Sequence, residues 1–257
     1  MLFRSIFDTE TVGKVSQDLL NIGYKIVDIN IQHADGKVLV ARDYLVRDLY
    51  NNRTYMLNDD FVGSKKLAKY DKLVADGMIT LRNIKQIFTT MANDIKKYKV
   101  LFGYAYNCDF DTDKFKRTAD GLGIANPLEG LPVFDIWAYA YEFIINTEDY
   151  KKWATQTEEF TATGFYISST VESVVRYLFN NKEFEEDHTA LSDVQWETEI
   201  LLECIRRNAD ITRALPKAKR VASEKVFHQV IVLPDGQVIE FDYKKQFIRG
   251  NRITYKG

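Results

Sequence analysis

"YKIVDINIQHADGKVLVARDYLV", residues 24–46, decides the fold of this chain. Apolar and polar residues alternate on both sides of "ADGK", which is the pattern of strands with one buried face. Asp35 and Gly36, between the two alternating runs, form a dipeptide that is typical of a tight hairpin turn. We therefore predict two antiparallel strands near residues 24–33 and 37–46.

Outward from this hairpin, the chain alternates between strand-like and helix-like patterns. Residues 2–7 are apolar and predict a strand that completes a three-stranded antiparallel meander. The other predicted elements are helices at 64–76 and 80–97, a strand at 99–105, a helix at 112–124 that Gly121 and Gly123 end, a strand that continues as a helix at 131–145, and helices at 167–178 and 189–207. This order predicts an α/β fold with a mixed sheet flanked by helices.

Three smaller features complete the predicted organisation. Ser169 and Glu172 have the spacing of a capping box, and the polar residues 146–165 predict an insertion loop or lid. The sequence "FHQVIVLPDGQVIEFDY" predicts a second hairpin near the C-terminus. We expect one body at residues 1–207 and an appended extension with a β-hairpin at residues 208–257.

Charge is distributed unevenly along the 257 residues, although the net charge is only −2. Residues 206–257 hold twelve Lys and Arg against five Asp and Glu, a net +7, which leaves −9 for residues 1–205. An acidic body with a basic end suggests a polyanionic partner held near carboxylates. The alternative is a solvated basic tail.

Composition indicates an ordinary globular protein, with 46% hydrophobic and 28% charged residues. Apolar runs stay well below the ~20 residues of a membrane span. The N-terminal sequence "MLFRSIFDTE" does not resemble a secretory signal. Two cysteines do not make a disulfide framework. We expect a cytoplasmic protein that does not associate with membranes.

Carboxylates gather at three places in the sequence. Asp8 and Glu10 lie two apart on an extended segment, so both side chains point to the same side. Asn107 and Asp111 lie in "NCDFD", between a predicted strand and a predicted helix, where helix capping is the alternative role for the acids. We expect the neighbouring Asp109 and Asp113 to act only as caps.

The third place is "HTALSD", which holds His188 and Asp193. These two residues do not share a face of a continuous helix. They converge if His188 lies on the loop that enters the helix and Asp193 lies in an early turn. For His33 and His228, on strand-like segments, we expect structural roles.

Together these residues have the chemistry of a divalent-cation site. Four hard oxygen donors, from Asp8, Glu10, Asp111 and Asp193, suit Mg²⁺ or Mn²⁺. Four carboxylates in one pocket raise each other's pKa unless cations neutralise them. Two such ions clamp the attacking and leaving oxygens of a phosphodiester, and a nearby histidine can take the proton of the attacking water.

Three motifs, in this order, resemble those of the DEDDh (DnaQ-like) 3′→5′ exonucleases. "DTETVG", residues 8–13, resembles their Asp-x-Glu-Thr-x-Gly motif. "NCDFD", residues 107–111, resembles Asn-x-x-Phe-Asp, and "HTALSD", residues 188–193, resembles His-x-Ala-x-x-Asp. Thr189 occupies the position of the tyrosine that defines the sister class. The resemblance covers roughly residues 2–207 and implies an RNase H-like fold with a mixed five-stranded sheet.

The resemblance also implies roles for residues. Asp8, Glu10, Asp111 and Asp193 would be ligands of two Mg²⁺ or Mn²⁺ ions, and His188 would be the general base. Thr11 and Asn107 would lie near the substrate, and we expect Phe110 to pack in the core. Outside the motifs, we predict that Lys244, Lys245, Arg249 and Arg252 hold the phosphate backbone. Candidate base-stacking residues are Tyr104, Tyr106, Trp137, Tyr139 and Tyr166, with core packing as the alternative for each.

The sequence thus predicts an enzyme that removes 5′-mononucleotides from the 3′ end of single-stranded DNA or RNA. A polymerase or another replication or repair protein is a candidate partner. One alternative is a non-catalytic nucleic-acid-binding module on the same fold, which would have a broken set of carboxylates. Another is a protein whose acidic face mimics nucleic acid. We favour the enzyme because all four acids and the histidine are present.

Overall fold

The computed structural model describes residues 3–13, 16, 18–59, 62–223, 226–232, 238–248 and 252–256, without the side chains of residues 64–65, 226–229, 231–232, 239–248 and 252–256. The chain forms two compact units. Unit 1 comprises Met1–Ala140 and Phe184–Lys217, and unit 2 comprises Tyr141–Glu183 and Ala218–Gly257.

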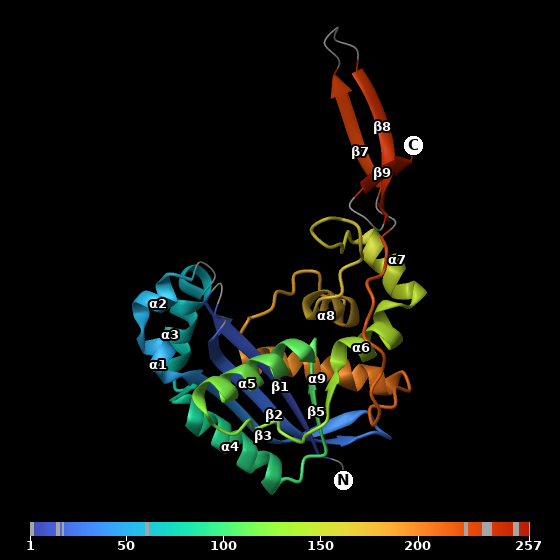
Figure 1. Ribbon diagram of the computed structural model, residues 1–257. Coiled ribbons are helices and arrows are strands. Elements are labelled where there is room, and N and C mark those ends of the chain that lie inside the picture. Colours follow the sequence, from blue (N-terminus) through green and yellow to red (C-terminus); the bar gives the residue numbers. More distant parts are fainter. Residues whose placement is uncertain are drawn as a thin grey trace. The chain divides into compact units, whose positions relative to one another are not determined.

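A mixed sheet forms the centre of unit 1 (Figure 1). Strands β1 (Phe3–Val12), β2 (Asp18–Asn30) and β3 (Asp35–Val46) pair antiparallel, which confirms the predicted meander. Strands β5 (Phe102–Ala105) and β6 (Val133–Asp135) continue the sheet in parallel with β1. The α/β fold with a mixed sheet flanked by helices is therefore confirmed.

The number of strands differs from the prediction, because the sheet has six strands in the order β4-β3-β2-β1-β5-β6. The additional strand, β4 (Thr80–Arg82), pairs in parallel with the end of β3. The prediction placed these three residues in the helix over 80–97. That helix, α4 (Ile84–Lys97), instead begins after Asn83, which forms a capping box with Gln86.

The remaining helices of unit 1 surround this sheet. They are α1 (Arg47–Asn51), α2 (Arg53–Leu57), the π-helical turn η1 (Val62–Lys66), α3 (Leu67–Ala75), α5 (Cys108–Leu122), α6 (Ile136–Ala140) and α9 (Ala190–Arg206). Helix α5 ends at Gly123, which has a left-handed backbone, close to where the glycines predicted its end.

The two faces of β1 contact different layers. Phe7 packs edge-on against Phe115 of α5, with ring centroids 5.8 Å apart, in a core that includes Phe88 of α4. Because side chains alternate along a strand, Asp8 and Glu10 point to the other face. That face carries α9, and Figure 1 shows α9 on the side of the sheet opposite α4 and α5.

Unit 2 contains the π-helical turn η2 (Tyr141–Ile145), helices α7 (Glu148–Gln156) and α8 (Val171–Phe179), and a separate sheet. Strands β7 (Val226–Val232) and β8 (Val238–Ile248) pair antiparallel, as the predicted hairpin requires, and β9 (Arg252–Lys256) adds a third strand. The predicted Pro-Asp-Gly turn lies outside the described residues.

Two local predictions in unit 2 are wrong. Residues 146–165 are not only a loop, because α7 lies within them and buries Tyr150 and Ala154. Helix α8 is capped by Thr170, not by Ser169, since the Thr170 hydroxyl accepts a hydrogen bond from the Ser173 N–H at 3.2 Å.

The expected boundary at residue 207 differs from the division between the units. Residues 208–217 belong to unit 1, where the hydroxyls of Tyr104 and Tyr139 donate to the carbonyls of Ile211 and Arg213. The separate roles of body and extension stay a prediction. Within the described residues, no helix is both long and apolar enough to cross a membrane.

Candidate active site

The end of β1 places the first two acids next to α9. In the sheet, Asp8 is paired with Gly23 of β2, and Glu10 is paired with Asn21. The pairing shifts by one residue between Glu10 and Thr11, and bulges of this kind occur frequently beside active sites because they redirect a side chain. Asp8 and Glu10 therefore share one face at a point where the strand is irregular.

The second strand fixes the beginning of α9. The side-chain carbonyl of Asn21 accepts a hydrogen bond from the Ala190 N–H at 2.8 Å. A Cβ atom at Gly23 would lie only 2.3 Å from the Leu191 nitrogen, so the glycine allows the helix backbone to approach the sheet. This close approach places the first turn of α9 beside Asp8.

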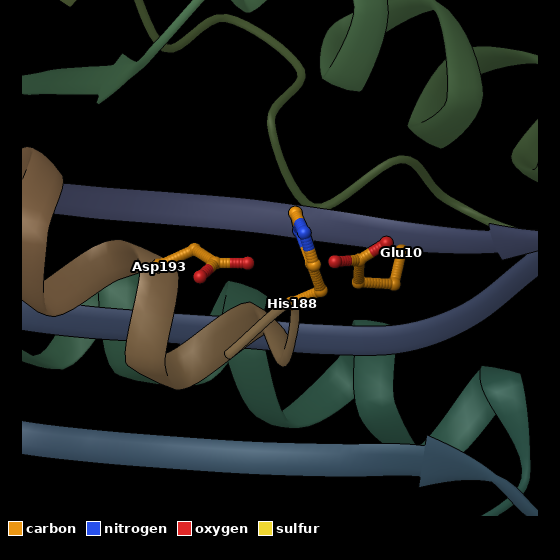
Figure 2. Close-up of side chains that lie close together, drawn as sticks. All are labelled: Glu10, His188 and Asp193. Atoms are coloured by element: carbon orange, nitrogen blue, oxygen red, sulfur yellow. The ribbon is translucent and has the colours of Figure 1, made fainter. Parts of the chain in front are cut away.

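His188 and Asp193 lie as predicted, on the loop before α9 and in its first turn. Figure 2 shows His188 between the side chains of Glu10 and Asp193. One possible ligand atom from each of these three residues lies within 4.8 Å of the other two. His188 has a positive φ of 50°, which is uncommon for a residue other than glycine.

Asp111 reaches the site from the first turn of α5, directly after the β5–α5 turn. Its carboxylate is 2% exposed and accepts a hydrogen bond from the Thr9 hydroxyl at 2.6 Å. The turn is held by Asp135 at the end of β6, whose carboxylate accepts from the Asn107 N–H at 2.8 Å. Sequence reasoning did not identify Asp135. Asn107 lies at the N-cap of α5 in a left-handed conformation, and its side chain makes no capping hydrogen bond.

Three expectations for this turn are wrong. Asp109 does not cap the helix but pairs with Lys217, and Asp113 pairs with Arg117. Phe110 does not pack in the core: it is 37% exposed, and the Lys114 ammonium lies 4.8 Å from its ring centroid. The phenylalanine of α5 that packs in the core is instead Phe115, whose ring contacts Phe7.

The acids influence each other strongly. Burial raises the pKa of Asp8 well above its usual range, and the nearby charges of Asp111, Glu197, Glu10 and Asp193 raise it further. Burial also raises the pKa of Asp111 to about 7, against the opposing effect of the Thr9 hydrogen bond. The pKa of Asp193 rises to about 8, first through burial and then through Glu186 and Glu10.

Glu197 is a fifth acid of the cluster, and sequence reasoning missed it. It lies one turn after Asp193 on α9 and is 2% exposed. One carboxylate oxygen accepts from the Tyr106 N–H at 3.2 Å. Burial and the charge of Asp111 raise its pKa well above the usual range. Its spacing of four residues from Asp193 was the available signal, because such residues share a helix face.

This donor set fits divalent cations. Buried polar atoms normally have hydrogen-bond partners. Within the described part of the chain, however, the buried Oδ1 of Asp193 and Oε2 of Glu197 have none. Oxygen ligands that are desolvated and mutually repulsive are suited to Mg²⁺ or Mn²⁺. Asp8, Glu10, Asp111 and Asp193 stay the predicted ligands, and the atoms that lie within 4.8 Å of one another belong to Glu10, His188 and Asp193.

The structure describes some of the other residues that were predicted to contact the substrate. Thr11 lies at the bulge that follows Glu10, and Asn107 is exposed at the start of α5. Tyr104 and Tyr139 are buried in the core, whereas Tyr106 and Trp137 are partly exposed and stack with ring centroids 6.5 Å apart. Arg249 and the side chains of Lys244, Lys245 and Arg252 lie outside the described residues.

The raised pKa values predict how the stability of the metal-free protein depends on pH. Asp111 and Asp193 hold protons in the folded state that the unfolded chain, with its lower carboxyl pKa, has already released. The free energy of unfolding therefore falls as the pH rises from about 4 to about 8. Between pH 6 and 8 we expect the Tm in EDTA to fall by at least about 4 °C more for the wild type than for an Asp111→Asn, Asp193→Asn variant.

Thermal unfolding at a series of pH values, with and without Mg²⁺, measures this effect. Mg²⁺ should reverse the decline in the wild type, because metal ions bind the deprotonated carboxylates. Equal slopes for the two proteins in EDTA would show that these acids are not protonated in the folded state.

Comparison with known proteins gives a structural match only. No family model matches the chain, and no curated protein matches it. A structure described as a full-length 3′-exonuclease aligns with a TM-score of 0.53 at 9% identity, over 98% of this chain and 93% of that protein. Exonuclease I aligns with a TM-score of 0.47 at 12% identity, over 82% of this chain and 42% of that protein. The first match shows that the chain shares its fold with a 3′-exonuclease.

Proposed function

We propose that this protein is a DEDDh-type 3′→5′ exonuclease that removes 5′-mononucleotides from single-stranded DNA or RNA. The observation that carries the proposal is the group of Glu10, His188 and Asp193, whose possible ligand atoms lie within 4.8 Å of one another. The charges of Asp8 and of the buried Asp111 interact with the carboxylates of this group. A folded protein tolerates so many buried carboxylates only where protons or cations compensate their charge. The fold shared with a 3′-exonuclease agrees with this chemistry.

Two divalent cations, when bound, would neutralise the cluster and stabilise the attacking and leaving oxygens of the phosphodiester. The four predicted ligands come from β1, α5 and α9, so they are held by rigid elements and not by a mobile loop. The His188 imidazole lies between Glu10 and Asp193 (Figure 2), where it would accept the proton of the attacking water. The leaving 3′ oxygen takes a proton from solvent.

Two further groups of residues would contact the strand. The partly exposed pair Tyr106 and Trp137 adjoins the cluster through the hydrogen bond from the Tyr106 N–H to Glu197 and offers a stacking surface for bases. The basic residues Lys244, Lys245, Arg249 and Arg252 would hold the phosphate backbone, and the net +7 of residues 206–257 supports this role.

A non-catalytic binding module on the same fold is the second candidate. It predicts that at least one carboxylate of the set is missing or displaced. Because the acids lie together and His188 lies beside Asp193, the arrangement favours the enzyme.

The test uses matched single strands and duplexes of DNA and RNA, labelled at the 5′ end, with Mg²⁺ or Mn²⁺. We expect a ladder of 5′-labelled products that shorten one nucleotide at a time, from single strands in preference to duplexes. Immediate release of the label as a mononucleotide would instead indicate attack from the 5′ end. Strands that stay intact with both metals, although the protein binds them, would favour the binding module.

A further inference from the structure

A lysine side chain lies inside the acidic cluster. Lys66 is the last residue of η1, and its ammonium lies 2.6 Å from the Glu10 carboxylate. Only 4% of the Lys66 side chain and 18% of the Glu10 side chain are exposed. A buried ammonium is strongly disfavoured unless an anion compensates it. Lys66 is therefore a cation that the fold itself supplies to the cluster.

The charge of Lys66 reaches more than one acid. It opposes the effects of burial, Glu186 and Glu10, which together raise the pKa of Asp193. Glu10 and Asp193 are also the two acids that lie on either side of His188 in Figure 2. The ammonium thus acts on the same carboxylates that we propose as ligands of a divalent cation.

Other residues near Lys66 also interact with the residues of the site. Lys69 pairs with the Asp187 carboxylate at 2.7 Å, next to His188. Tyr70 is buried, and burial followed by the charges of Glu10, Asp43, Asp193 and Asp8 raises its pKa. Lys66 also ends a π-helical turn, a geometry that occurs frequently at functional sites. These contacts show that η1 and α3 form one wall of the cluster.

We propose that Lys66 competes with a divalent cation for Glu10, so that metal binding displaces the ammonium from the carboxylate. The proposal rests on the proposed function, since it takes Glu10 and Asp193 as metal ligands. A divalent ion and an ammonium on one carboxylate repel each other strongly in a poorly solvated site. In the wild type, part of the metal's binding energy is therefore spent on displacing Lys66, and the metal-free protein is stabilised by the same ion pair.

The experiment measures Mn²⁺ binding to the full chain without nucleic acid. Isothermal titration and the Mn²⁺-dependent rise in Tm are recorded for the wild type, Lys66→Met and Lys72→Met. Lys72 is the matched control, because it is an exposed lysine of α3. We expect Lys66→Met to bind Mn²⁺ at least about tenfold more tightly than the wild type, as for the loss of a close charge pair. Lys72→Met should bind Mn²⁺ like the wild type.

The metal-free form provides an independent readout. In EDTA, Lys66→Met should have a lower Tm than the wild type, because Glu10 loses its counter-ion, and Mn²⁺ should raise its Tm by a larger amount. If Lys66→Met does not fold, Lys66→Gln keeps a hydrogen-bond donor without the charge and is expected to show the same changes.

The outcomes separate this proposal from the proposed function. If the wild type binds Mn²⁺ and Lys66→Met binds it equally or more weakly, Lys66 does not compete and the metal site itself stands. If Glu10→Gln binds Mn²⁺ like the wild type, Glu10 is not a ligand and the competition is ruled out. If neither the wild type nor Lys66→Met binds Mn²⁺, both proposals fail.

Discussion

Replacement of Asp8 by asparagine is expected to abolish the proposed exonuclease activity and to leave the metal-free protein folded. The pKa of Asp8 is raised by the charges of Asp111, Glu197, Glu10 and Asp193, so Asp8 interacts with all the other acids named for the cluster. Asparagine keeps the shape of the side chain but removes the charge that would hold cations. Because bound cations contribute several kcal/mol to phosphodiester cleavage, we expect a loss of at least about 10³-fold in kcat/KM.

The stability of this variant distinguishes a role in the reaction from a role in folding. Asp8→Asn removes one of several mutually repelling carboxylates, so its Tm in EDTA should equal or exceed that of the wild type. A residue that only supports the fold would lower the Tm when it is replaced. A loss of activity together with a gain in metal-free stability is typical of a functional residue whose surroundings are unfavourable for its charge.

Asp113→Asn is the matched control for this measurement. Asp113 is an exposed acid close in sequence to Asp111, and among the described residues it forms ion pairs with Lys114 and Arg117 of α5. The control should degrade a 5′-labelled single strand at the wild-type rate. If Asp8→Asn retained activity within about tenfold of the wild type, Asp8 could not be a ligand of a catalytic cation.

Sequence reasoning was reliable where the pattern is local and extended over many residues. The hairpin of β2 and β3 follows from alternation on both sides of Asp35-Gly36, and the structure confirms the hairpin. The predicted turn is wrong, because Asp35 and Gly36 pair within β3 and the turn lies at residues 31–34. The positions of His188 and Asp193 at the start of α9 also follow from local spacing. Strand β4 was missed because three residues are too few to show alternation, and its pairing with β3 is a tertiary contact.

Burial of charged side chains could not be predicted from the sequence. Glu197 and Lys66 lie in segments rich in charged residues, where a solvent-exposed position is the usual expectation. Phe110 shows the opposite outcome, because this aromatic residue was expected in the core and is exposed. Each outcome depends on which neighbours the fold brings to the residue. The carboxylate of Asp135 is a further example, because it supports the Asn107 turn from a different strand.

Replacement of Gly23 by alanine is expected to move the first turn of α9, which carries Asp193, away from Asp8 on β1. A Cβ atom at this position would lie 2.3 Å from the Leu191 nitrogen and 2.4 Å from the Ala190 carbonyl carbon, both of which are backbone atoms of α9. Since backbone atoms cannot rotate away, the first turn of α9 must move from the sheet. We expect the free energy of unfolding to fall by about 1–3 kcal/mol, which is the usual range for overpacking a buried site.

Gly121→Ala provides the control for this substitution. Within the part of the chain that the structure describes, a Cβ atom at Gly121 meets no other atom within 4 Å, and the residue lies within α5. Because alanine favours helix more than glycine does, this variant should be more stable than the wild type by about 0.5–1 kcal/mol. Chemical denaturation of the three proteins gives both differences in one series.

The functional consequence of Gly23→Ala follows from the sheet register. Gly23 pairs with Asp8 across β1 and β2. Because the first turn of α9 packs closely against Gly23, Asp193 in that turn lies near Asp8. A shift of that turn should weaken Mn²⁺ binding even at temperatures where the variant is fully folded. If the folded variant bound Mn²⁺ as tightly as the wild type, the ligands on β1 and α5 would suffice without Asp193. The glycine would then serve packing alone, and the metal site would have to be assigned to Asp8, Glu10 and Asp111.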